Sequence, residues 1–139
     1  MQYHSVEYLE RKSEFCRVLL LACQGVTQLL IVTPDKMDSL NDYFKLAFGD
    51  KAAKELRTAK SININEKLTI FFEGKDKDSE FKKGNIFAPW ASINTIYNVI
   101  KDPRGVNTFY IPHSGENSGP GTKDELKLYL ENYPKSKAV

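Results

Sequence analysis

The run VTQLLIV, residues 26–32, decides the fold of this chain. It is rich in β-forming residues and nearly continuous in its apolar half, the pattern of a strand that is covered on both faces of a sheet. Two shorter runs of the same kind follow, NIFA at residues 85–88 and VNTFYI at residues 106–111. Right-handed crossovers would make these three strands parallel.

Helical spacing of apolar residues separates these strands. A first helix is expected over about residues 5–24, although a strand over residues 15–22 is the alternative for that segment. Further helices are predicted from Thr33 and Pro34 to Phe48, from an Asp50 cap to Thr58, over residues 93–100, and from a capping box at Thr122 and Glu125 to Tyr133.

The middle of the chain predicts a hairpin followed by an exposed connection. Residues 62–72 alternate apolar and polar side chains around Asn65 and Glu66, which indicates two antiparallel strands. Residues 73–84, EGKDKDSEFKKG, are mostly charged and offer almost nothing to bury, so a solvated loop or hairpin extension is expected. The tail from Pro134 is expected to fray.

The order of elements is therefore helix, strand, two helices, hairpin, strand, helix, strand and helix. This alternation predicts an α/β fold, a single-domain layered sandwich in which helices flank a mixed sheet of about five strands. One domain would span residues 1–139.

Charge and composition narrow the classes of partner. The chain has 20 Lys and Arg against 18 Asp and Glu, and 41% of its residues are apolar, as in ordinary globular proteins. The signs are interspersed and the pI is 8.4, which disfavours dedicated nucleic-acid binding. The best basic run, Lys51, Lys54, Arg57 and Lys60, would spiral around its helix as a solvated face.

The two cysteines indicate a reducing compartment. Cys16 and Cys23 would lie on one helical face about 10 Å apart, which is too far for a disulfide. The longest apolar run, residues 18–23, is too short to cross a bilayer, and the charged start of the chain does not resemble a signal peptide. A cytoplasmic protein without membrane association is expected.

Parallel strands would bring three strand-to-helix turns to one edge of the sheet, which is where open α/β sheets bind ligands. These turns lie at residues 32–34, 88–90 and 111–113. Trp90 would offer an aromatic platform there, although core packing is the favoured interpretation of this side chain. The candidate ligand-binding residues are Thr33, Trp90, His113, Ser114, Asn117, Thr122 and Lys123.

The segment PHSGENSGPGTKDE, residues 112–125, is the most suggestive part of that edge. Glycines let a backbone approach a ligand closely, and the helix that follows would offer free N–H groups to a small anion. The order Gly121-Thr122-Lys123 inverts the Lys-then-Ser/Thr order of a phosphate loop, so a nucleotide P-loop is disfavoured. A flexible loop with a helix cap is the simpler interpretation.

Nothing in the sequence assembles a catalytic or metal signature. His113, Ser114 and Glu116 are too close in sequence to form a nucleophile, base and orienting group by themselves, so we assign no catalytic residue. His4 is expected at the surface. Because there is no HxxxH or CxxC spacing, we expect neither a metal nor another cofactor.

The leading hypothesis is a non-catalytic binding or regulatory module that acts through a protein partner or a small anionic ligand. The alternative is a phosphate- or nucleotide-handling enzyme that uses the loop at residues 113–123. A third hypothesis is a homodimer formed through aromatic side chains, since one member of each pair Tyr43/Phe44, Phe71/Phe72 and Phe109/Tyr110 would be partly exposed.

The catalytic alternative makes a specific prediction about His113, which would move a proton. His113→Ala would then abolish the turnover of an enzyme, whereas it would leave the partner affinity of a binding module intact. Turnover and calorimetric affinity, measured on the same preparations, check this. Turnover that survives the substitution would exclude the proposed role of His113.

Overall fold

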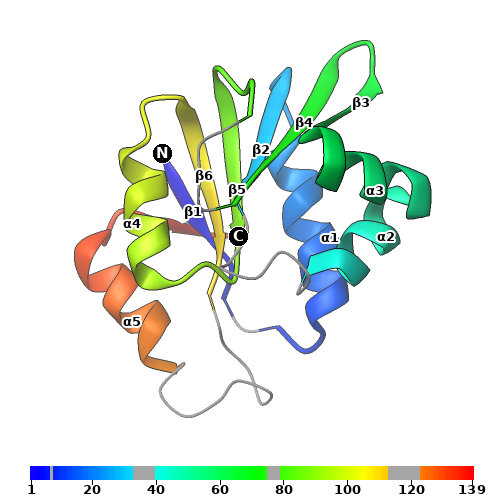
Figure 1. Cartoon of the computed structure of the whole chain (residues 1–139). Helices are drawn as coiled ribbons and strands as arrows, with labels where there is room; N and C mark the ends of the chain where they lie inside the picture. Colours follow the sequence, from blue (N-terminus) through cyan, green and yellow to red (C-terminus); the bar gives the residue numbers. More distant parts are fainter. Residues whose placement is uncertain (7, 33–39, 75–78, 113–122) are drawn as a thin grey trace.

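The computed structural model describes residues 1–6, 8–32, 40–74, 79–112 and 123–139. Within them, a sheet of seven strands has the order β3-β4-β2-β5-β6-β1-β7, and only β3 is antiparallel to its neighbour (Figure 1). The strands are β1 (Gln2–His4), β2 (Gln28–Val32), β3 (Ser61–Asn65), β4 (Leu68–Glu73), β5 (Gly84–Pro89), β6 (Gly105–Ile111) and β7 (Lys137–Ala138). The predicted α/β class is confirmed, but with seven strands rather than about five.

Helices cover both faces of this sheet (Figure 1). One face carries α1 (Arg11–Ala22), α2 (Asn41–Phe48) and α3 (Asp50–Ala59), and the other carries α4 (Ile93–Lys101) and α5 (Lys123–Asn132). None of the helices in the described ranges combines the length and apolar character that crossing a bilayer requires.

Strand β2 separates two hydrophobic cores. Leu29 and Ile31 belong to the core under α1, α2 and α3, whereas Leu30 and Val32 belong to the core under α4 and α5. All six residues of β5, its neighbour, are buried. The prediction that β2 is covered on both faces and runs parallel to β5, and β5 to β6, is confirmed.

Both ends of the chain differ from the sequence prediction. The first helix begins at Arg11 instead of near residue 5, and residues 2–4 form β1 instead. The tail does not fray, because Lys137 and Ala138 pair with β1. The partners of both short strands are far away in the sequence, so no local pattern could indicate them.

The helices of the first face need smaller corrections. The helix α2 begins at Asn41, and the predicted cap at Thr33 and Pro34 lies outside the described residues. Gly49, not Asp50, caps α3 and has a φ of 87°, which glycine adopts without strain. The strand alternative for residues 15–22 is wrong, because they lie in α1.

The predicted aromatic patch does not form on the sheet. Phe71 and Phe72 are both buried, as are Phe109 and Tyr110, because each face of the sheet has its own core. Tyr43, beside the buried Phe44, is half-buried and fits the prediction.

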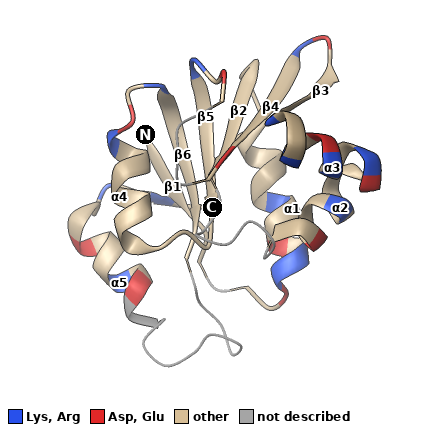
Figure 2. Ribbon diagram, in the orientation of Figure 1, with Lys and Arg blue, Asp and Glu red and all other residues tan. Residues whose placement is uncertain are grey.

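The basic residues on α3 are only partly a solvated face. Lys51 and Lys54 are exposed, and Figure 2 shows acidic residues interspersed with basic ones on this helix. Arg57 instead donates a hydrogen bond to the Asn41 side chain at 2.7 Å. The Lys60 ammonium lies 5.1 Å from the centre of the Phe72 ring, a cation–π contact.

The charged segment after the hairpin is not simply a solvated loop. Glu73 ends β4 and is only 2% exposed, and Phe81 is buried against Phe71 with their rings 5.9 Å apart. The prediction that residues 73–84 offer nothing to bury is therefore wrong for these two side chains. Residues 75–78 lie outside the described ranges.

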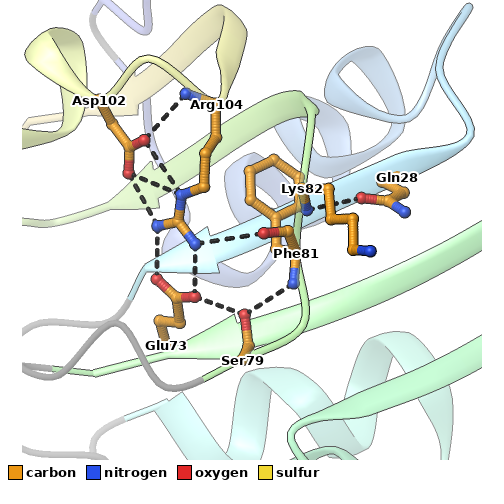
Figure 3. Close-up of polar contacts among 7 residues, drawn as sticks. All are labelled: Gln28, Glu73, Ser79, Phe81, Lys82, Asp102 and Arg104. Carbon is orange, nitrogen blue, oxygen red and sulfur yellow. Dashed lines mark hydrogen bonds and ion pairs between the residues drawn. The ribbon is translucent and has the colours of Figure 1, made fainter.

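Arg104 joins this segment, which follows β4, to the turn before β6, although β2 and β5 lie between these two strands (Figure 3). Arg104 donates to both carboxylate oxygens of Glu73, at 2.8 and 2.9 Å, and to Asp102 at 2.8 Å. Its guanidinium also lies 5.2 Å from the centre of the Phe81 ring. We call the contacts among Glu73, Asp102 and Arg104 the Arg104 bridge.

The Arg104 bridge keeps Glu73 ionised despite its burial. Burial alone would raise the pKa of Glu73, but hydrogen bonds from Arg104 and Ser79, together with the charge of Arg104, outweigh it and lower the pKa. The bonds to Glu73 and Asp102 in turn raise the pKa of Arg104. Charge-assisted, bidentate pairs of this type resist opening more than neutral hydrogen bonds do.

Arg104→Met is expected to destabilise the fold by about 3 kcal/mol, because it leaves two buried carboxylates without their cation. This is the low end for a buried pair, since 20% of the Arg104 side chain reaches solvent. Denaturant unfolding of Arg104→Met and of Lys101→Met, an exposed neighbour of equal charge, measures the difference.

The destabilisation caused by Arg104→Met should become smaller in acid. The pKa of Glu73 is lower in the folded chain than its ordinary value of 4.5, so its contribution is present above that pH and disappears as the pH falls through the folded pKa. A constant difference from neutral pH down to pH 3 would contradict this account of the bridge.

Candidate functional site

At one edge of the sheet, two pairs of adjacent strands lead to helices on opposite faces, and we call such strand pairs divergent. Chain leaving β2 passes to α2 on one face, whereas chain leaving the adjacent β5 passes to α4 on the other. The adjacent strands β6 and β1 diverge in the same way, toward α5 and α1. In open α/β sheets such divergence opens a crevice outside the carboxyl ends of the strands. We call this side of the sheet the carboxyl edge.

Trp90 lies at the carboxyl edge, directly after β5, in a strained conformation. Its φ is 53°, in the left-handed region that bulky residues rarely adopt, and its side chain is 3% exposed. The backbone is held there by a hydrogen bond of 2.7 Å from the Trp90 amide to the Ile111 carbonyl. Strain of this kind persists only where surrounding contacts impose it, and it concentrates at functional sites.

Tyr8 connects the ends of three strands around this tryptophan. The Trp90 indole donates to the Tyr8 hydroxyl at 2.7 Å, and that hydroxyl donates to the Pro112 carbonyl at 3.0 Å. Tyr8 follows β1, Trp90 follows β5 and Pro112 follows β6. The half-buried phenol therefore fixes how these three strand ends lie relative to one another.

Two further side chains complete the cluster. The Arg11 guanidinium lies 5.4 Å from the centre of the Trp90 ring, and the Tyr43 ring lies 5.0 Å from it. Arg11 is half-buried and opens α1, whose N-cap residue Glu10 makes no side-chain capping bond. We call Tyr8, Arg11, Tyr43 and Trp90 the edge cluster.

The edge cluster and the start of α1 together offer the groups with which proteins hold anions. A cation lies over an aromatic ring, and the first turn of α1 adds amide N–H groups and the positive end of the helix dipole. Lys12 adds a second, exposed positive charge in that turn, where Figure 2 shows basic residues at the start of α1.

One buried serine–carboxylate pair lies near the carboxyl edge, but its burial excludes a nucleophilic role. Ser5 donates to Glu14, and Arg17 donates to both oxygens of the same carboxylate at 2.7 and 2.8 Å. Burial would raise the pKa of Glu14, but these bonds lower it overall. Because Ser5 is fully buried and its carboxylate is neutralised by Arg17, the pair cannot meet a substrate.

The sequence-predicted site residues fall mostly outside the described ranges. Thr33, His113, Ser114, Asn117 and Thr122 lie there, and so does the predicted capping box of Thr122 with Glu125. Lys123 begins α5, but its side chain is likewise outside what the structure describes. Trp90 is at the predicted edge, and its core-packing interpretation is confirmed by its burial.

Sequence reasoning missed Tyr8, Arg11 and Tyr43. The predicted first helix began near residue 5 and so included Tyr8 and Arg11 in its first two turns, whereas in the structure Tyr8 precedes α1 and Arg11 begins it. The only sequence signal for this site was a possible helix start after Glu10, which would place Arg11 and Lys12 in the first turn.

The cysteines and histidine outside the edge cluster do not suggest chemistry. Cys16 and Cys23 are half-buried free thiols, as the spacing predicted, and burial raises the pKa of Cys23 to about 11. His4 is buried, which corrects its predicted surface position. Among the described residues, no group of three or more His, Cys, Asp or Glu side chains is arranged to hold a metal.

No model of a known protein family matches the chain, and no curated protein matches it significantly. The assignment of a function therefore depends on the residues at the carboxyl edge and on their geometry.

Tyr8→Phe is expected to destabilise the fold by about 1–2 kcal/mol, because it leaves the buried Trp90 indole N–H without an acceptor. It should also change the fluorescence of the single tryptophan. Tyr43→Phe is the matched control, since it keeps the ring contact with Trp90 and removes a hydroxyl that makes no hydrogen bond to a described residue. Equal behaviour of the two variants would show that Tyr8 does not position Trp90.

Proposed function

We propose that this protein is a non-catalytic binding module that takes up a small anionic ligand at the carboxyl edge of its sheet. The observation that carries the proposal is the Arg11 guanidinium over the strained Trp90 ring, at the edge where two strand pairs diverge. A binding function needs a preorganised surface, and the hydrogen bonds through Tyr8 supply one.

The chemistry of the edge cluster favours an anion over a neutral or cationic ligand. An arginine such as Arg11 can pair with a carboxylate or phosphate through two parallel hydrogen bonds. Its contact with an aromatic ring restricts the side chain before a ligand arrives, which reduces the conformational entropy that is lost on binding. The anion site predicted at residues 113–123 follows β6 in the sequence, and its part in binding stays a prediction.

A thermal melt against a ligand panel tests the proposal. The panel contains inorganic phosphate, nucleotides and small carboxylates, each at millimolar concentration. A ligand present at 100 times its dissociation constant stabilises the folded state by about 2.7 kcal/mol, which raises the midpoint of a domain of this size by several degrees.

Three variants show which residues are responsible for the rise in the thermal midpoint. Arg11→Gln should abolish the shift, whereas Lys12→Gln, which removes an equal charge from the next residue of the same turn, should leave most of it. Lys123→Ala reports on the loop at residues 113–123, whose participation remains a prediction. A panel that produces no shift, or a shift that Arg11→Gln and Lys12→Gln reduce equally, would overturn the proposed site.

A further inference from the structure

The C-terminal strand β7 is the least protected strand of the sheet. It has two residues, both exposed, and it pairs on one side only, with β1. It covers the outer edge of β1, whose other edge pairs with β6. Its attachment therefore depends on contacts other than an extended ladder.

Those contacts converge on His4. The Val139 amide donates to the His4 carbonyl at 3.0 Å, and the Ser136 hydroxyl lies 2.8 Å from His4 Nδ1. The Tyr129 hydroxyl of α5 lies 2.7 Å from that same Ser136 oxygen. One further contact comes from α1, where Arg17 donates to the Val139 carbonyl at 3.1 Å.

The surroundings of His4 favour its neutral form. The imidazole is 4% exposed and lies beside the Tyr129 ring, 5.8 Å away, and next to Tyr110, its partner on β6. The charged groups of the other adjoining elements are few. Lys137 of β7 is itself positive, Glu14 of α1 is paired with Arg17, and Glu125 of α5 acts on Tyr110.

The hydrogen bonds around His4 can form in both of its protonation states. A neutral imidazole can accept from Ser136 at Nδ1 or donate to it, and a protonated imidazole donates from Nδ1 to Ser136, whose hydroxyl then donates to Tyr129. The cost of protonation is therefore the burial of the positive charge beneath the C-terminal segment and α5, in the direction in which burial lowers the pKa of His4.

We propose that His4 is a proton-operated latch for the C-terminal strand: protonation of its imidazole releases residues 136–139 and bares the outer edge of β1. The latch responds to pH independently of the ligand proposed for the edge cluster.

Hydrogen exchange read by mass spectrometry tests the latch. After correction for intrinsic exchange rates, protection of the peptide covering residues 134–139 should fall between pH 7.5 and pH 5, by up to tenfold per pH unit between the ordinary pKa of 6.5 and the lower folded pKa of His4, and should level off below the folded pKa. Protection of the β2 amides should stay constant, which separates local release from global unfolding. Equal protection of the C-terminal peptide at both pH values overturns the proposal.

Variants test whether His4 causes the pH dependence of protection in the C-terminal peptide. His4→Asn keeps an acceptor near the position of Nδ1 and cannot become charged, so protection should no longer depend on pH. His113→Ala removes the other histidine of the chain and should leave the response intact. Ser136→Ala removes the hydroxyl that contacts both His4 and Tyr129 and should weaken protection at pH 7.5. A pH response that persists in His4→Asn overturns the latch.

Discussion

Burial of β2 and β5 on both faces is the constraint on which the rest of the structure depends. Leu29 and Ile31 need cover on one side of the sheet, and Leu30 and Val32 need it on the other. The helices must therefore divide between the faces, and adjacent strands must send their connections in opposite directions. The divergent pairs at the carboxyl edge, and with them the candidate site, follow from this requirement.

The margins of the sheet depend on polar contacts between distant residues. The Arg104 bridge holds a charged carboxylate at Glu73, and the contacts of His4 hold a neutral imidazole. Acid works against both, because it protonates a carboxylate that the fold keeps ionised and an imidazole that the fold keeps neutral. Acid sensitivity should therefore begin at the Arg104 bridge and at the contacts of His4.

At the carboxyl edge, the structure holds a strained tryptophan where the strands diverge. Hydrogen bonds from Trp90 to Tyr8 and Ile111 impose that conformation, and Arg11 lies over the indole ring. An exposed cation alone would be an ordinary surface feature. We propose that this half-buried cation on a rigid aromatic support is a preorganised anion receptor, and for that reason we favour binding over catalysis as the function of this edge.

The sequence by itself determined the elements whose signals are local. The continuous apolar run of β2, the alternation of the hairpin, and the helix predicted over residues 93–100 all required only neighbouring residues. Tertiary structure alone decided β1 and β7, whose few residues become strands through pairing, and the burial of Glu73, whose cation lies 31 positions away. It likewise brought Tyr8, Arg11 and Tyr43 to Trp90, because contacts between separate elements leave no periodic trace in the sequence.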